Sequence, residues 1–219
     1  MSSLAYIPAR GGSKGIKGKN KREMHGMPLV EWSILQAKAS SVDSVVVSSD
    51  DDEILEIAMR NGVQAVRRAP HLATDNAQID DAIIEEVQSF VPNPDEIVLL
   101  QPTSPLRRPY DIDRALEHFR EAHADSLLSM TETDHKFQWE RDRDLSWVQP
   151  YTTRPRRQDM PLGFRENGSI YVTRFPELVR HKSRVCGKIA AYTMEEFQGF
   201  EIDTETDWVI VEALMEKML

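Results

Sequence analysis

The sequence predicts an α/β protein built as a three-layer, doubly wound and mostly parallel β-sheet. Short apolar runs rich in β-branched residues alternate with segments whose apolar residues recur at helical spacing, which is typical of repeated strand–helix units. The strand-like runs are almost continuously apolar, and this indicates strands covered by helices on both faces. A length of 219 residues is enough for one sizeable core, so we expect a single domain over residues 1–219.

The predicted elements begin close to the amino-terminal end. Residues 4–8 form a short apolar run that proline and glycine interrupt, so we expect a strand followed by a loop. A helix begins at Pro28, a residue favoured in the first turn, because the apolar residues after it recur at helical spacing. Residues 44–49 predict a buried strand, and residues 53–61 predict a short helix that ends at a glycine.

The same alternation continues to residue 130 and then changes. The pattern predicts a helix, a strand, a helix and a strand, in turn, at 79–90, 96–100, 112–119 and 126–130. Residues 131–158 carry aromatic residues among many charges without a helical period, so we expect strands or an arm that leaves the sheet. An excursion with exposed aromatic residues usually meets a partner, and this one would be inserted within the domain. Strand character returns at 168–173 and 188–193, and a terminal helix follows the acidic stretch at 201–207.

Composition and charge exclude several classes of function. The formal net charge of −9 argues against a protein that coats nucleic acid, because a phosphate backbone needs a basic stripe. No apolar run approaches the roughly 18–20 residues of a membrane span, and the first residues lack the pattern of a signal peptide. Cys186 is the one cysteine, so no intrachain disulfide can form and a small buried hydrophobe is expected there. A cytoplasmic location is the default expectation.

The loop after the first predicted strand carries an unusual concentration of positive charge. It reads IPARGGSKGIKGKN over residues 7–20, and six basic residues without an acid lie between Arg10 and Arg22. Like charges that close repel one another unless a negative group lies among them. Neither standard phosphate loop fits, because the residue after Lys19 lacks a hydroxyl and the glycine spacing of GxGxxG is missing. The placement favours a cradle for a small anion such as a polyphosphate, and a solvated basic loop is the alternative.

Six segments of the sequence together resemble one family of enzymes. They are IPARGGSKGIKGKN at 7–20, SSDDDEI at 48–54, LLQPTSPLR at 99–107, RPRRQD at 154–159, RENGSIYV at 165–172 and EIDTETDW at 201–208. In this order they resemble the acylneuraminate cytidylyltransferases, also called CMP-sialic acid synthetases, over essentially the whole chain. The Kdo cytidylyltransferases share the general plan but generally lack the GGSK loop and the RPRRQD…ENGSIY pair, so they rank second.

The resemblance implies a Rossmann-like nucleotidyltransferase that transfers the CMP group of CTP to a nine-carbon 2-keto sugar acid and releases pyrophosphate. The anomeric hydroxyl would attack the α-phosphorus in line while the protein neutralises charge on the phosphates. Catalytic roles would fall to Arg10, Lys14 and Asp203. The nucleotide would be held by Arg10, Gly11, Gly12, Ser13, Lys14, Lys19 and Asn20, and Arg68 and Asp75 match positions near the cytosine and ribose.

The resemblance also implies an acceptor site and a metal site. Gln101, Arg157, Arg165 and Tyr171 match positions that hold the sugar. The alternative for the arginines that crowd this segment is a network of surface ion pairs with Asp159 and Glu166; these arginines are Arg154, Arg156, Arg157 and Arg165. The family usually presents two aspartates two residues apart, and this chain has Glu201 and Asp203 as the candidate ligands for Mg²⁺, for which Mn²⁺ can substitute. In an extended chain both carboxylates would lie on one face. The alternative is that Asp203 and Thr204 cap the terminal helix.

Several alternatives stay open from the sequence. The acceptor could be N-acetylneuraminate, legionaminate, pseudaminate or a deaminated relative, because these acids differ at substituents that only the shape of a pocket can distinguish. A cytidylyltransferase for another keto-sugar acid such as Kdo, or a CTP-binding regulator without turnover, are the other functions considered. The aromatic residues of the arm, together with its resemblance to the dimerisation arm of the family, predict a homodimer or a dimer of dimers. Neither nucleic acid nor a membrane is expected as a partner.

Overall fold

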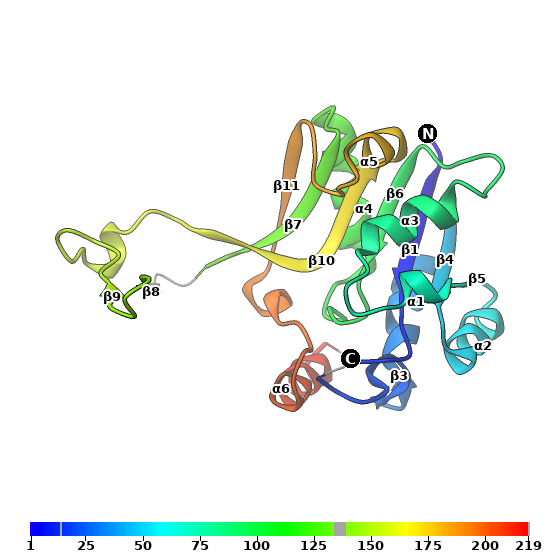
Figure 1. Cartoon of the computed structure of the whole chain (residues 1–219), viewed down its shortest axis with the longest axis horizontal. Helices are drawn as coiled ribbons and strands as arrows, with labels where there is room; N and C mark the ends of the chain where they lie inside the picture. Colours follow the sequence, from blue (N-terminus) through cyan, green and yellow to red (C-terminus); the bar gives the residue numbers. More distant parts are fainter. Residues whose placement is uncertain (14, 134–138, 219) are drawn as a thin grey trace.

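The centre of the molecule is a seven-stranded mixed β-sheet in the order β11-β7-β10-β6-β1-β4-β5 (Figure 1). The computed structural model describes residues 1–13, 15–133 and 139–218. Six strands run parallel, and β10 runs antiparallel to its neighbours β6 and β7. The prediction of a mostly parallel sheet is therefore confirmed. The strands are β1 (Ser3–Pro8), β4 (Ser44–Ser49), β5 (Gln64–Arg67), β6 (Glu96–Leu100), β7 (Ser126–Glu132), β10 (Phe164–Arg174) and β11 (Ile189–Met194).

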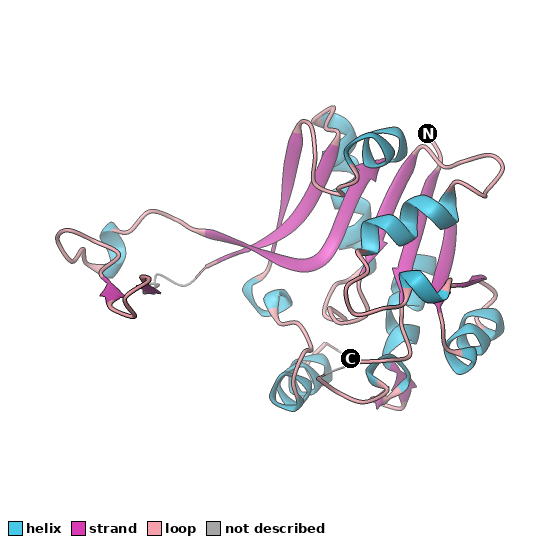
Figure 2. Ribbon diagram, viewed as in Figure 1, coloured by secondary structure: helices cyan, strands magenta, loops and turns pink. Residues whose placement is uncertain are grey.

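Helices cover both faces of this sheet, as the apolar strands predict (Figure 2). Successive side chains of a strand point to opposite faces. In β1, Ala5 and Ile7 pack in the cluster that includes one set of helices, whereas Leu4 and Tyr6 pack in the cluster on the other side. The first set is α1 (Leu29–Lys38), α2 (Asp52–Arg60) and α4 (Pro109–Glu121), and the second is α3 (Ile79–Val87) and α5 (Phe175–His181).

A third, smaller core joins the loop after β1 to the last helix, α6 (Glu205–Glu216). Ile16 of the loop, Ile202 and Trp208 are buried together in it. The guanidinium of Arg22 lies 4.2 Å from the centre of the Trp208 ring, a favourable cation–π contact. This packing brings residues 201–203 beside the glycine-rich loop. The loop continues into the short hairpin β2 (Glu23–Met24) and β3 (Met27–Pro28).

The described residues from 139 to the start of β10 lie outside the central sheet and project away from it (Figure 1). They include the short strands β8 (Glu140–Arg141) and β9 (Trp147–Val148) and the 3-10 turn η3 (Arg157–Asp159). Residues 139–150 are all exposed, including Trp139 and Trp147. We call the described residues 139–163 the arm; residues 134–138, which the predicted arm also included, lie outside the described part of the chain.

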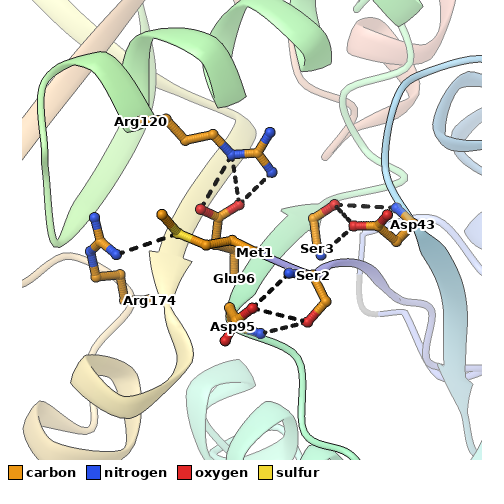
Figure 3. A network of polar contacts seen from close by, with 8 residues as sticks. All are labelled: Met1, Ser2, Ser3, Asp43, Asp95, Glu96, Arg120 and Arg174. Carbon is orange, nitrogen blue, oxygen red and sulfur yellow. Dashed lines mark hydrogen bonds and ion pairs between the residues drawn. The ribbon is translucent and has the colours of Figure 1, made fainter.

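Polar contacts fasten the amino ends of the central strands (Figure 3). The Ser2 N–H donates to the Asp95 carboxylate at 2.7 Å, and the Ser3 N–H donates to Asp43 at 2.7 Å. These backbone hydrogen bonds lower the pKa of both aspartates. The buried carboxylate of Glu96 accepts hydrogen bonds from Arg120 at 2.6 and 3.0 Å. These contacts lie at the amino ends of the strands, away from the carboxyl ends at which a doubly wound sheet usually binds its ligands.

Candidate functional site

A cavity of about 230 Å³ lies at the carboxyl ends of β1, β5 and β6. In a doubly wound sheet this edge is where ligands bind. Six of the residues that we predicted for the site line it: Arg10, Ser13, Lys19, Asn20, Arg68 and Gln101. They come from segments far apart in the sequence, so the fold assembles them. Thr74, Gln78 and Thr103 also line the cavity and were not predicted.

Hydrogen bonds between side chains and backbone groups of the glycine-rich loop hold the loop in place. The Asn20 side-chain amide donates to the Arg10 carbonyl at 2.9 Å, which closes the loop on itself. The Gly11 N–H donates to Asp50 at 2.8 Å. Arg10 forms an ion pair of 2.8 Å with Asp75, so two predicted site residues meet directly. Lys14 lies outside the described residues.

Acids from distant segments neutralise much of the basic cluster. Lys19 is 8 % exposed, and its Nζ donates to the Ile202 carbonyl at 2.5 Å and to the Asp203 carboxylate at 3.2 Å. Lys21 lies 3.0 Å from the Asp51 carboxylate, and Arg22 pairs with a glutamate of α6. The positive charges of the loop are therefore partly balanced by these acids and do not need a bound anion to be tolerated. A bound polyphosphate is proposed only next to the loop residues that line the cavity.

Arg68 forms one wall of the cavity although it is only 5 % exposed. Its Nε donates to the Ser48 hydroxyl at 3.0 Å, and its Nη2 donates to the Ser48 carbonyl at 3.1 Å. Both acceptors belong to β4. The guanidinium is thus fixed by the sheet rather than by a surface ion pair, and a fixed, largely buried cation at a cavity wall can recognise an acceptor atom of a ligand.

Gln101 lines the cavity and connects it to β10. The Gln101 amide donates to the Gly168 carbonyl at 2.9 Å. Gly168 has a φ of 63°, and a Cβ there would overlap the Glu201 carboxylate, so this position requires glycine. Tyr171 is buried in the core facing α3, and its hydroxyl donates to Glu166. Burial, followed by the contact with Glu166, raises the pKa of Tyr171.

Of the two arginines predicted for the acceptor site, the structure describes the side chain of Arg165 and not that of Arg157. The exposed Arg165 approaches the Gly199 carbonyl at 3.5 Å. The side chain of Arg157 lies outside the described part of the chain. Its neighbour Arg156 pairs with Asp159 at 2.7 Å, so the alternative of surface ion pairs holds for that residue.

Arg107 is a buried residue that connects the segment directly after β6 to the middle of β10, and it was not predicted as a site residue. Its guanidinium donates to the carbonyls of Ser169 at 2.7 Å and Gln101 at 2.8 Å. Burial lowers the pKa of Arg107 to about 9. The arginine stands within the LLQPTSPLR segment, and it could have been found there as a charge among apolar residues.

Glu201 and Asp203 are the candidate metal ligands. Burial, and next the charges of Asp203 and Glu166, raise the pKa of Glu201 to about 7. A divalent cation would relieve this crowding of negative charge, so the two carboxylates fit Mg²⁺, which is usually held by one or two carboxylates together with substrate phosphates. Within residues 1–13, 15–133 and 139–218 no group of three or more His, Cys, Asp or Glu side chains could hold a metal by itself.

The carboxylate of Asp203 does not cap α6. Thr204 makes that cap: its hydroxyl accepts from the Asp207 N–H, and the Asp207 carboxylate accepts from the Thr204 N–H at 2.8 Å. The capping alternative is therefore right for Thr204 and wrong for Asp203. The Asp203 side chain is 75 % exposed, and Lys19 is its partner.

Comparisons with known proteins relate this chain to one family of enzymes. The family model described as cytidylyltransferase matches residues 4–219. N-acylneuraminate cytidylyltransferase B of Danio rerio is 36% identical over 217 residues, which are 95% of this chain and 50% of that protein. CMP-N,N'-diacetyllegionaminic acid synthase of Legionella pneumophila is 33% identical over 230 residues, covering 99% of this chain and 97% of that one. This chain therefore spans about half the length of the Danio rerio relative and nearly all of the Legionella one.

A solved structure shows the same fold. CMP:2-keto-3-deoxy-manno-octonic acid synthetase, solved in complex with CTP, superposes with a TM-score of 0.78 and covers 100% of both chains at 19% identity. None of the helices that the structure describes combines the length and the apolar character needed to cross a lipid bilayer.

Proposed function

The chain belongs to the cytidylyltransferase family, and on this premise we propose that it activates a sialic-acid-type nine-carbon 2-keto sugar acid with CTP. The products would be the CMP-sugar and pyrophosphate. The observation that carries the proposal is the cavity at the carboxyl ends of the strands, where Arg10, Ser13, Lys19 and Asn20 meet Arg68 and Gln101.

CTP would occupy the cavity with its phosphates on the glycine-rich loop. Arg10 and Lys14 would neutralise charge on the phosphates, and the Ser13 hydroxyl and the N–H groups of Gly11 and Gly12 would donate to their oxygens. Arg68 and the neighbouring wall would receive the nucleoside. Asp75 would share Arg10 with the nucleotide, since Arg10 lines the cavity and both side chains of the ion pair are partly exposed.

The acceptor acid would lie beside β10, with Gln101, Arg157, Arg165 and Tyr171 as its contacts. Guanidinium groups match the planar carboxylate of such an acid. In the reaction the anomeric oxygen forms a bond to the α-phosphorus, and the bond from that phosphorus to the bridging oxygen of pyrophosphate breaks. The chain's part is to hold both anions in line, which removes the entropic cost of their encounter.

Glu201 and Asp203 would hold the magnesium ion that the family implies. When bound, the ion would neutralise charge on the phosphate oxygens as a Lewis acid. Lys19 keeps the Asp203 carboxylate and the Ile202 carbonyl in position next to the loop. A glutamate replaces the usual first aspartate, so its longer side chain would reach the ion from farther away or through water.

N,N'-diacetyllegionaminate is the second candidate acceptor. The observation in its favour is that the Legionella synthase matches this chain over nearly the full length of both proteins. Pyrophosphate release with CTP should be measured over N-acetylneuraminate, legionaminate, pseudaminate, a deaminated acid and Kdo. Turnover with Kdo alone would contradict the nine-carbon assignment. Binding of CTP without turnover on any acid would support a regulator instead.

Single substitutions divide the site into its two halves. Arg10→Ala or Lys14→Ala should remove most turnover while the fold persists, because charge at the phosphates matters most in the transition state. Arg157→Ala should raise mainly the KM for the acceptor acid. A loss of CTP binding alone in the last variant would contradict our assignment of Arg157.

The arm supports a homodimer or a dimer of dimers as the working form. Trp139 and Trp147 are exposed on an excursion that projects from the body, and large exposed aromatic groups are typical of interfaces (Figure 1). Sedimentation at micromolar concentration should give a mass of at least two chains. Sedimentation as a monomer of 25.1 kDa would refute this assignment. The buried, unpaired Cys186 is compatible with the cytoplasm as the proposed location.

A further inference from the structure

A buried carboxylate lies behind the wall of the cavity. Glu86 of α3 is 8 % exposed and does not line the cavity. It occupies a position of α3 where the helical spacing of Ile79, Ile83 and Val87 would place an apolar residue. Its two oxygens accept hydrogen bonds from two strands, from the Tyr6 hydroxyl at 2.8 Å and from the Ser48 hydroxyl at 2.9 Å.

Ser48 links this carboxylate to Arg68. The Ser48 hydroxyl has one proton, which it donates to Glu86. The lone pairs of the Ser48 hydroxyl oxygen then point away from Glu86 and can accept a hydrogen bond from Arg68. The Nε–H of Arg68 donates to the same oxygen at 3.0 Å. Glu86 therefore sets the direction in which Ser48 accepts. The carbonyl of Ser48 accepts from Arg68 Nη2 at 3.1 Å and from the Ala9 N–H at 2.9 Å, directly before the glycine-rich loop.

This arrangement leaves one end of the Arg68 guanidinium for a ligand. Its contacts with the described part of the protein use Nε and Nη2, and among those residues no acceptor lies on Nη1. Burying a carboxylate is costly unless it is well hydrogen-bonded. Burial raises the pKa of Glu86, and the hydrogen bonds from Tyr6 and Ser48 and the charge of Arg68 act in the opposite direction.

We propose that Glu86 is a positioning residue for nucleotide binding, which acts through Ser48 to aim the Arg68 guanidinium at an acceptor atom of the nucleoside of CTP. The inference rests on the proposed function. It goes beyond it because Glu86 and Ser48 touch neither the substrate nor the reacting atoms. A network that merely fastens α3 to the sheet would stabilise the fold without affecting how CTP binds.

The test compares Glu86→Gln with a matched control at a second buried glutamate. Glu96→Gln makes the same change at the opposite ends of the strands, where the carboxylate pairs with Arg120. Ser48→Ala removes the connecting hydroxyl and no charge. For each variant, calorimetry measures the Kd of CTP and of inorganic tripolyphosphate, thermal unfolding measures Tm, and steady-state kinetics measures the KM of the acceptor acid.

Glu86→Gln and Ser48→Ala should each weaken CTP binding by about 5- to 20-fold, which is part of the loss expected for a missing charged donor, because the guanidinium is misdirected but not removed. Tripolyphosphate binding and the acceptor KM should stay within about twofold, because Arg68 acts on the nucleoside. The double variant should bind CTP no more weakly than Ser48→Ala alone, since both changes break one connection. Glu96→Gln should lower Tm and leave the Kd of CTP unchanged.

Three results would overturn the proposal. They are wild-type CTP affinity in Ser48→Ala, an equal loss of CTP and tripolyphosphate binding, and additive losses in the double variant. Because Ser48→Ala introduces no buried charge imbalance, it decides the question even if Glu86→Gln fails to fold. A wild-type protein that binds no CTP would refute the proposed function itself, and this outcome is separate from the other three.

Discussion

Replacing Lys19 by methionine should destabilise the protein and reduce turnover together. The side chain joins two segments that are 183 residues apart, the glycine-rich loop and the turn before α6. Methionine keeps the buried apolar stem but removes the ammonium group that donates to Ile202 and Asp203. The Ile202 carbonyl, part of the third core, then loses its charged donor.

The expected magnitude follows from these two contacts. A hydrogen bond from a charged group contributes about 1.5–3 kcal/mol to the free energy of unfolding. The ion pair with Asp203 adds little, because that side chain is 75 % exposed and water screens it. For a chain of this size the total corresponds to a fall in Tm of about 3–12 °C. Turnover should fall at least about tenfold, since Asp203 is no longer held beside the phosphates.

Lys21→Met is the matched control. It lies in the same loop and pairs with Asp51 at 3.0 Å and Glu53 at 2.5 Å, but its side chain is 34% exposed. Its Tm should stay within about 1 °C of wild type and its turnover within about twofold, as for most surface ion pairs. Thermal unfolding and pyrophosphate release measure both variants. Equal losses of Tm in Lys19→Met and Lys21→Met would refute the reasoning.

Three further predictions follow from the same structure. Asp203→Asn should leave Tm within about 2 °C, lower turnover at least ~10²-fold and be partly rescued by Mn²⁺; normal turnover at low millimolar Mg²⁺ would exclude the metal site. Arg120→Ala should lower the free energy of unfolding in urea by about 2–3 kcal/mol, since it strands the buried Glu96 but is itself 38% exposed; a change below about 0.5 kcal/mol would contradict this. Asp43 and Asp95 have folded-state pKa values below their unfolded values. Their contribution to the free energy of unfolding is therefore present above about pH 4 and is lost as the pH falls through the folded-state pKa values. The difference in the free energy of unfolding between pH 6 and pH 3, measured in urea, should be smaller for the Asp43→Asn/Asp95→Asn double variant than for the wild type.

The sequence predicted the elements whose signal is local. β4 begins and ends at the predicted residues, because a β-branched run between polar residues defines both ends. β5 and α5 were missed. β5 is a short edge strand with exposed ends, and α5 has only 7 residues and a proline in its first turn, so neither shows a clear period. β10 begins at Phe164, four residues before the predicted strand, because its exposed first part pairs with β7 outside the core.

The candidate site was predictable where one segment carries its chemistry. Arg10, Ser13, Lys19 and Asn20 line one cavity because they belong to one loop after one strand. The partners of that loop were not predictable. Asp75 lies 65 residues from Arg10, and no local pattern relates the two. Glu86 could have been noticed as an acid on the apolar side of a helix, but the hydroxyls that accommodate it come from β1 and β4 and are known only from the fold.

The two strands on either side of the arm in the sequence, β7 and β10, are neighbours in the sheet. Glu132 pairs with Phe164, and the Thr133 N–H donates to the Gly163 carbonyl at 2.9 Å. The two ends of the excursion are thus held together by the sheet itself. Closing a loop between adjacent fixed points costs only about 0.6 kcal/mol more for each doubling of its length. The excursion can therefore be lengthened, shortened or replaced by a tight turn without breaking the strand pairing of the core. If the proposed assembly through the arm is correct, changes in the arm would alter that assembly without altering how one chain folds.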